Sequence, residues 1–219
     1  SGYSEPEESV HDHFVIGHTS TSVSLATGLA KGRDLVGGKG NVIAVIGDGS
    51  LSGGEALEGL NVAGELNSNL IVIVNDNQMS IAENHGGMYE GLKMLRESNG
   101  ASPDNLFRAM NLDYVYVPDG NDIQQLIDTF RKVKDSTRPI VVHINTLKGK
   151  GYKPAEENKS CSFIGSYPEH LKRLFVLREL LKIFLCQHLL YILLASRIDH
   201  SYAGTLEAGT GETTAIDPR

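Results

Sequence analysis

The sequence predicts an α/β fold, a mostly parallel β-sheet with helices on both of its faces. Two nearly continuous apolar runs, NVIAVIG at residues 41–47 and LIVIV at residues 70–74, are typical of strands buried on both faces. Segments with apolar residues at helical spacing separate and follow these runs. Strands that alternate with helices favour right-handed crossovers, which make neighbouring strands parallel.

Each expected helix has its own pattern. Residues 20–35 are rich in Ala, Leu and Val, with small residues that permit close packing. Residues 53–66 and 122–133 each carry a stripe of apolar side chains at helical spacing. Ser102 or Asp104 is expected to cap a further short helix that ends at Met110.

The expected strands occupy residues 41–47, 70–74, 114–117 and 139–147. The turn-forming string NDN at residues 75–77 is expected to end the second strand. A loop rich in Gly and Asn is expected from there to about residue 100.

Composition and charge exclude some classes of protein. The chain has 219 residues and a formal charge of −7, which argues against nucleic-acid or anionic-membrane partners. Its two cysteines, Cys161 and Cys186, form no CxxC pair or disulfide framework, so a reducing cytoplasm is expected. Residues 1–8 are polar and turn-like, unlike a signal peptide.

The first candidate site follows two expected strands. In parallel α/β sheets ligands bind beyond the carboxyl ends of the strands, so Asp48 in GDG and Asn77 in NDN are expected at one edge. Their oxygens, the backbone carbonyl of Met79 and diphosphate oxygens together suit octahedral Mg²⁺. The alternative is that each string is a plain turn.

Two further segments favour an anion. GHTSTS at residues 17–22 precedes a helix, where hydroxyl groups and free amides bind anions, although ordinary N-capping is the simpler alternative. KGKGY at residues 148–152 follows the fourth expected strand, and its charge could face a phosphate or simply be solvated.

Four strings carry a family resemblance: GHTSTS at 17–22, GDGSLSGGEALEGLNVAGEL at 47–66, NDNQMSIAEN at 75–84 and KGKGYKPAE at 148–156. They resemble the 1-deoxy-D-xylulose 5-phosphate synthases, which are transketolase-like thiamine-diphosphate enzymes. The resemblance covers about residues 5–159. It implies a thiamine-diphosphate-binding, transketolase-like fold for residues 1–159, with thiamine diphosphate and Mg²⁺ as cofactors.

The resemblance also implies roles for single residues. Asp48 and Asn77 match the magnesium ligands, with Met79 as the carbonyl donor, and Asn77 also touches the cofactor. The remaining matched residues contact the cofactor: Gly17, His18, Thr19, Gly49, Ser50, Tyr152 and, close by, Lys148.

The implied reaction joins pyruvate and glyceraldehyde 3-phosphate, with loss of carbon dioxide, to give 1-deoxy-D-xylulose 5-phosphate. This product feeds isoprenoid, thiamine and pyridoxal synthesis. The pyrimidine-binding domain of the family has no counterpart in the sequence. A homodimer or a partner chain that supplies this domain is therefore expected, and the chain alone is expected to be inactive.

Residues 160–219 are expected to be a divergent tail, because the resemblance stops after Lys159. Residues 171–196 are dense in Leu, Ile and Phe, but the uncharged part, 183–196, is shorter than the roughly 20 residues that span a bilayer. A packed or partner-binding helix, in a frameshifted or fused segment, is the hypothesis. Two other functions stay open: a split transketolase-type subunit and a non-catalytic binding or assembly domain.

Overall fold

The chain folds around a four-stranded parallel sheet, as the sequence predicts. The computed structural model describes residues 4–79 and 83–157, so the expected tail lies outside the described residues. The sheet has the order β1-β2-β4-β3. Its strands are β1 (Val42–Gly47), β2 (Leu70–Asp76), β3 (Asp113–Val117) and β4 (Ile140–Asn145).

Strand β2 lies inside the sheet, paired with β1 on one side and β4 on the other. Its first five residues are all buried, which explains why the run has no polar alternation. The register pairs Gly47 with Asn75 and Asp76 with Asn145. The carboxyl ends of β1, β2 and β4 therefore meet at one edge of the sheet.

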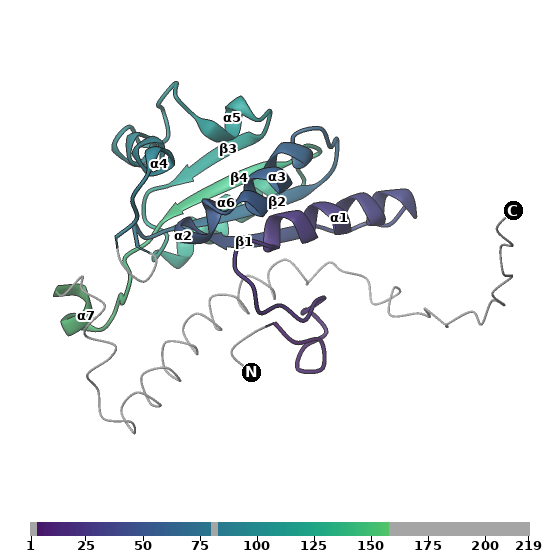
Figure 1. Ribbon diagram of the computed structural model, residues 1–219, viewed down its shortest axis with the longest axis horizontal. Coiled ribbons are helices and arrows are strands. Elements are labelled where there is room, and N and C mark those ends of the chain that lie inside the picture. The colour runs from purple at the N-terminus through teal and green to yellow at the C-terminus, as the bar shows by residue number, and fades with distance from the viewer. Residues whose placement is uncertain (1–3, 80–82, 158–219) are drawn as a thin grey trace, which may run out of the picture.

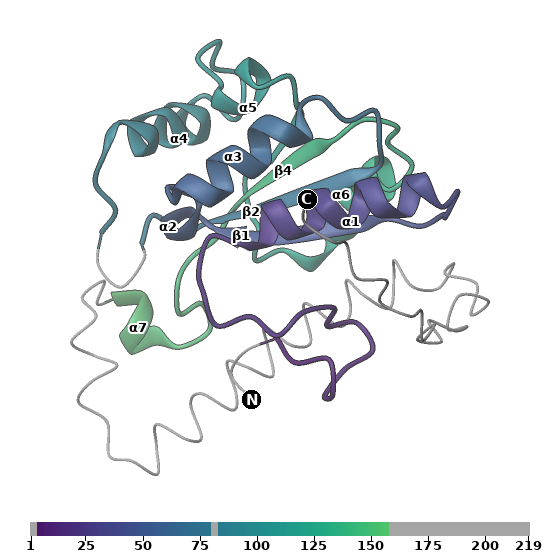
Figure 2. The same cartoon turned by 45° about the vertical axis from the view of Figure 1, so that its right-hand side comes forward.

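Helices cover both faces of the sheet, which confirms the predicted layers (Figures 1 and 2). The hydrophobic cluster on one face includes residues of α1 (Ser22–Leu35), α3 (Gly54–Ala63), α4 (Gly87–Glu97) and α5 (Leu106–Ala109), together with Leu51. Helix α6 (Ile123–Val133) packs into the cluster on the other face. Two short helices, α2 (Asp48–Leu51) and α7 (Lys153–Glu157), follow β1 and β4.

Alternation along the strands separates the two clusters. Leu70, Val72 and Val74 of β2 belong to the cluster with α1 and α3, whereas Ile71 and Ile73 belong to the cluster with α6. Because successive side chains alternate between the two faces, the position of a polar residue along its strand determines the face on which it lies. The face beneath α3, α4 and α5 carries the candidate site.

The expected loop before residue 100 is wrong for residues 87–97, which form α4. Leu92 and Leu95 lie three residues apart on its buried side. Three glycines, at 86, 87 and 91, hide this helix in the sequence because Gly has a low helix propensity. Its N-cap, Gly86, has a φ of 134°, a conformation that favours glycine.

Two smaller predictions are also corrected. Strand β2 continues through Asn75 and Asp76 of the expected turn, because both residues pair with β4. The cap of α5 is neither Ser102 nor Asp104 but Asn105, whose side chain accepts hydrogen bonds from the backbone N–H groups of Phe107 and Arg108.

Within residues 4–79 and 83–157, no helix has the length and apolar character needed to cross a membrane.

Candidate functional site

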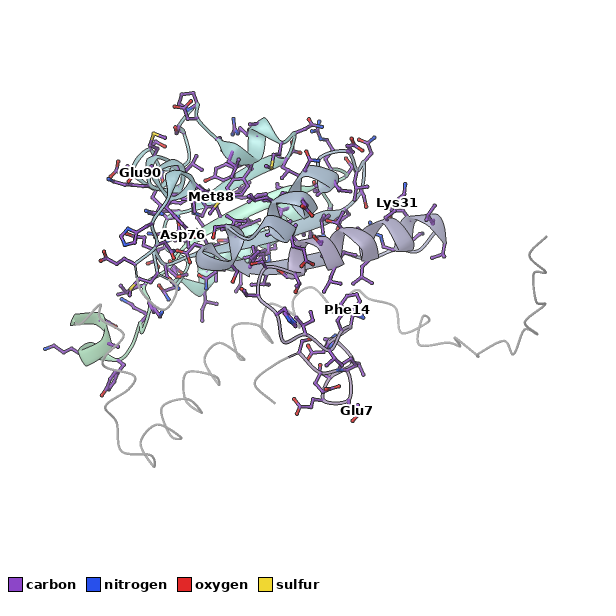
Figure 3. The ribbon with its side chains drawn as sticks, viewed as in Figure 1. Glu7, Phe14, Lys31, Asp76, Met88 and Glu90 are labelled. Carbon is purple, nitrogen blue, oxygen red and sulfur yellow. The ribbon has the colours of Figure 1, made fainter. Side chains whose placement is uncertain are left out.

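The two predicted strand tips lie side by side. Asp48 follows β1 directly and Asn77 follows β2 directly, at the edge fixed by the Gly47–Asn75 register pair. By alternation, Asp48 and Asp76 share the face that carries α3 and α4. Both carboxyl side chains are buried, with exposures of 2% and 0%. Figure 3 shows Asp76 at the same end of the sheet as Met88 and Glu90 of α4.

Asp76 is a fully paired carboxylate. Its Oδ2 accepts a hydrogen bond from His143 Nε2 at 2.9 Å and forms an ion pair with the Arg96 guanidinium. Its Oδ1 accepts from the backbone N–H of Gln78 at 3.1 Å. Burial opposes ionisation of Asp76, but the hydrogen bond from His143 and the charge of Arg96 outweigh it and lower the pKa.

Asp48 lacks a cationic partner of that kind among the interactions of the described residues. Its Oδ2 accepts a hydrogen bond from the neutral amide of Asn84 at 2.8 Å. Burial and then the nearby charge of Asp76 raise the pKa of Asp48 to about 6, although the N–H groups of Gly49 and Gln78 partly offset them. The site therefore holds more negative charge than its protein neighbours neutralise.

A divalent cation fits this arrangement. It would supply the positive charge beside Asp48, and the available donors are a carboxylate, the amide oxygen of Asn77 and the nearby backbone of Met79. Hard oxygen donors of this kind suit Mg²⁺. The magnesium roles of these three residues stay predictions, which agree with their oxygen donors and with the burial of Asp48.

Asn77 lies in a tight turn. Its Oδ1 accepts a hydrogen bond from the backbone N–H of Met79 at 3.0 Å, and the residue between them, Gln78, has a left-handed φ of 66°. An amide oxygen has two lone pairs, so this bond leaves one for a further ligand.

The 17–22 segment meets the segment after β1. The hydroxyl groups of Thr19 and Ser50 are hydrogen-bonded to each other, which brings two predicted cofactor contacts together. Gly17 and His18 come just before Thr19 in this loop, and both are exposed. Thr21 occupies the N-cap of α1, but its hydroxyl donates to the backbone oxygen of His18 instead of capping the helix. The side-chain N-capping alternative is therefore wrong for Thr21.

The loop that follows β4, residues 146–152, also begins at this edge of the sheet. The backbone N–H of Thr146 donates to the carbonyl of Asp76 at 2.8 Å, and the Thr146 hydroxyl donates to Asn75 Oδ1 at 2.6 Å. Lys148 follows two residues later and is half-buried. Tyr152 lies just before α7, which stands away from the sheet in both ribbon views (Figures 1 and 2). Gly49 and Ser50 are half-buried in α2.

The sequence analysis does not identify four residues that the structure joins here: Asp76, Arg96, His143 and Tyr114, whose hydroxyl is 2.8 Å from Nδ1 of His143. The sequence predicts Asp76 only as a turn former and places Arg96 in the expected loop. The available signal was a histidine inside the apolar strand IVVHIN, since a buried histidine needs hydrogen-bond partners.

Comparison with known proteins identifies the family. A family model described as 1-deoxy-D-xylulose-5-phosphate synthase matches residues 1–102 and 99–146. The chain belongs to this family. The resemblance predicted from the four sequence strings is thereby confirmed, and 1-deoxy-D-xylulose-5-phosphate synthases form an enzyme family.

Individual relatives agree. The chain is 41% identical over 208 residues to 1-deoxy-D-xylulose-5-phosphate synthase 1 of Geobacter metallireducens, covering 78% of this chain and 33% of the relative. It is 39% identical over 194 residues to the synthase of Nitratidesulfovibrio vulgaris, covering 72% of this chain and 30% of the relative. The chain thus spans about a third of the length of the curated relatives it matches.

Among solved structures, transketolase from Leishmania mexicana is similar with a TM-score of 0.45 and 21% identity, over 60% of this chain and 20% of that chain. At this TM-score the likeness adds nothing to the parallel sheet that the strand registers establish.

Proposed function

We propose that residues 4–157 form the diphosphate-binding part of a thiamine-diphosphate- and Mg²⁺-dependent 1-deoxy-D-xylulose 5-phosphate synthase. The observation that carries this proposal is the environment of Asp48. Asp48 is 2% exposed and lies near the ionised Asp76. The side chain that donates a hydrogen bond to its carboxylate is the neutral amide of Asn84. Such a carboxylate is suited to receive a cation.

The residues divide into two proposed roles. Asp48, the amide oxygen of Asn77 and the carbonyl of Met79 would hold Mg²⁺. The other predicted contacts would surround the cofactor: Gly17, His18, Thr19, Gly49, Ser50, Lys148 and Tyr152. The Thr19–Ser50 hydrogen bond supports this grouping because it joins the two segments expected beside the diphosphate.

Bound thiamine diphosphate would supply the carbon–carbon chemistry, as cofactors do for reactions that side chains perform poorly. The chain's own residues would neutralise and orient the diphosphate end. The substrates would be pyruvate and glyceraldehyde 3-phosphate, and the product 1-deoxy-D-xylulose 5-phosphate is an isoprenoid precursor. A pyrimidine-binding domain from a homodimer or a partner chain would complete the cofactor site, in the cytoplasm.

Calorimetry with Mg²⁺ and thiamine diphosphate tests the proposal. We expect the 219-residue chain to bind the cofactor only when Mg²⁺ is present, and Asp48→Asn to weaken binding more than about tenfold. The matched control is Asp104→Asn, which changes an exposed aspartate and is expected to bind like the wild type. Equal binding by Asp48→Asn and the wild type would contradict the proposed site.

A turnover assay addresses the complete reaction. We expect no conversion of pyruvate and glyceraldehyde 3-phosphate by the 219-residue chain alone, because it spans about a third of its relatives. Activity of the purified chain would refute this expectation.

A further inference from the structure

A chain of buried polar groups crosses three strands beneath the candidate site. The hydroxyl of Tyr114 on β3 is 2.8 Å from Nδ1 of His143 on β4, and Nε2 of His143 is 2.9 Å from Oδ2 of Asp76 on β2. The exposures of these residues are 9%, 0% and 0%. Burying three polar side chains in a core destabilises a protein unless they are satisfied, and here each has a partner.

The protonation states decide which group donates and which accepts in each of these hydrogen bonds. Burial raises the pKa of Tyr114, so its phenol keeps its proton. The Arg96 guanidinium can only donate, so Oδ2 of Asp76 is an acceptor in their ion pair. We therefore assign the Nε2–H tautomer to His143, with Nδ1 accepting from Tyr114. The three groups form one continuous set of donors and acceptors that ends on Asp76.

Asp76 also contacts the turn that carries Asn77, through its second carboxylate oxygen. While His143 and Arg96 hold Oδ2, Oδ1 accepts the backbone N–H of Gln78. Gln78 has a φ of 66°, a conformation that L-residues rarely adopt and that surrounding contacts must maintain. The Asp76–Gln78 bond spans Asn77, so it fixes the residue that is expected to present its amide oxygen to the cation.

We propose that Asp76 and His143 are positioning residues for the cation site, which hold Asn77 next to Asp48 through the turn at Gln78. This inference rests on the proposed function for the identity of the site. Neither residue needs to touch the cation, because the Asp76 carboxylate is already occupied by three donors. Partners behind metal ligands set ligand orientation, and their loss weakens metal affinity about 10- to 100-fold.

A purely structural role for the same residues makes a different prediction. Tyr116, also on β3, packs edge-on against the His143 ring at a centroid distance of 5.2 Å. No hydrogen bond of its hydroxyl to His143 or Asp76 occurs within the described residues. If only packing around His143 matters, removing either tyrosine hydroxyl should have the same effect. If the hydrogen bonds from Tyr114 through His143 to Asp76 hold the turn, only removal of the Tyr114 hydroxyl should have an effect.

The test compares Tyr114→Phe with the matched control Tyr116→Phe in the 219-residue chain. Tyr114→Phe keeps the ring stacked on Phe107 at 5.6 Å and removes one oxygen atom. The first readout is Mn²⁺ affinity by electron paramagnetic resonance. The second is the hydrogen-exchange rate of the Gln78 amide in the metal-free protein, which does not depend on cation binding.

We expect Tyr114→Phe to weaken Mn²⁺ binding about three- to tenfold and to accelerate exchange at Gln78, while Tyr116→Phe leaves both unchanged. His143→Gln, which cannot bridge both partners, should weaken Mn²⁺ binding about 10- to 100-fold. Circular dichroism confirms folding of each variant.

The outcomes separate the two proposals. If the wild type binds no Mn²⁺, the proposed cation site fails, and the Gln78 exchange rates still decide the positioning role. Equal effects of the two Phe variants, or unchanged Gln78 exchange in Tyr114→Phe, overturn the positioning role even if the wild type binds Mn²⁺.

Discussion

Replacing Asp48 by Asn should make the metal-free chain more stable. The pKa of Asp48 rises from 3.8 to about 6 on folding, because the group is buried and lies near the charge of Asp76. A pKa difference of one is worth about 1.4 kcal/mol, so ionisation of folded Asp48 costs up to about 3 kcal/mol at pH 7. This value is an upper bound, because charges inside proteins are partly screened. We expect a gain of about 1–2 kcal/mol in Asp48→Asn.

The same substitution has a defined pH dependence. The folded chain binds a proton at Asp48 more tightly than the unfolded chain does, so stability is lost as the pH rises from about 4 to about 6. Below that range Asp48→Asn and the wild type should be equally stable, and above it the variant should be more stable. The amide keeps an oxygen that can accept the hydrogen bond from Asn84.

Urea unfolding at several pH values, with chelator and then with excess Mg²⁺, measures both effects. Mg²⁺ should stabilise the wild type and leave Asp48→Asn unaffected, since a ligand stabilises only the state that binds it. Asp104→Asn should match the wild type throughout. The reasoning is refuted if Asp48→Asn is less stable than the wild type at pH 7, or if their difference does not change between pH 4 and pH 7.

Two further substitutions test the packing behind the site. Arg96→Gln should destabilise the chain by about 3–5 kcal/mol in urea unfolding, because it leaves a buried carboxylate underpaired, whereas Arg131→Gln in an exposed pair should change stability by less than about 1 kcal/mol. Gly59→Ala should lower stability by about 1–2 kcal/mol, because its Cβ would lie 2.6 Å from Ser24 Oγ and 2.8 Å from Ser24 N. Gly28→Ala, which meets no atom within 4 Å, should instead raise the melting temperature through higher helix propensity. Similar effects for the members of either pair would contradict these explanations.

Local patterns were sufficient to predict the sheet and the position of Asp48 and Asn77. The apolar runs that became β1 and β2 are continuous, and the crossover rule makes such strands parallel, so their carboxyl ends must share an edge. This deduction needs no knowledge of side-chain contacts. It therefore succeeded before any interaction between distant residues was known.

The buried network could not be predicted in that way. Asp76 and His143 are 67 positions apart, and their contact depends on β2 pairing with β4 instead of β3. Arg96 reaches Asp76 from α4, a helix hidden by the glycines around its first turns. Local composition identifies the apolar strands, but tertiary packing determines which of their side chains meet.

The nearly unbroken apolar character of β1 and β2 has a consequence for how the sheet finds its alignment. In the native register Ala44 and Ile46 of β1 are buried, whereas Val45 on the other face is 42% exposed, so the expectation that this strand is buried on both faces is wrong. Sliding β1 by one residue along β2 would bury other aliphatic side chains in place of Ala44 and Ile46, but it would turn Asp48 to the α6 face, away from Asp76. Hydrophobic burial alone therefore distinguishes poorly between the native and the shifted pairing. A cation that requires oxygen atoms from both strand tips would bind only the native pairing, and so would select it from misaligned alternatives during folding.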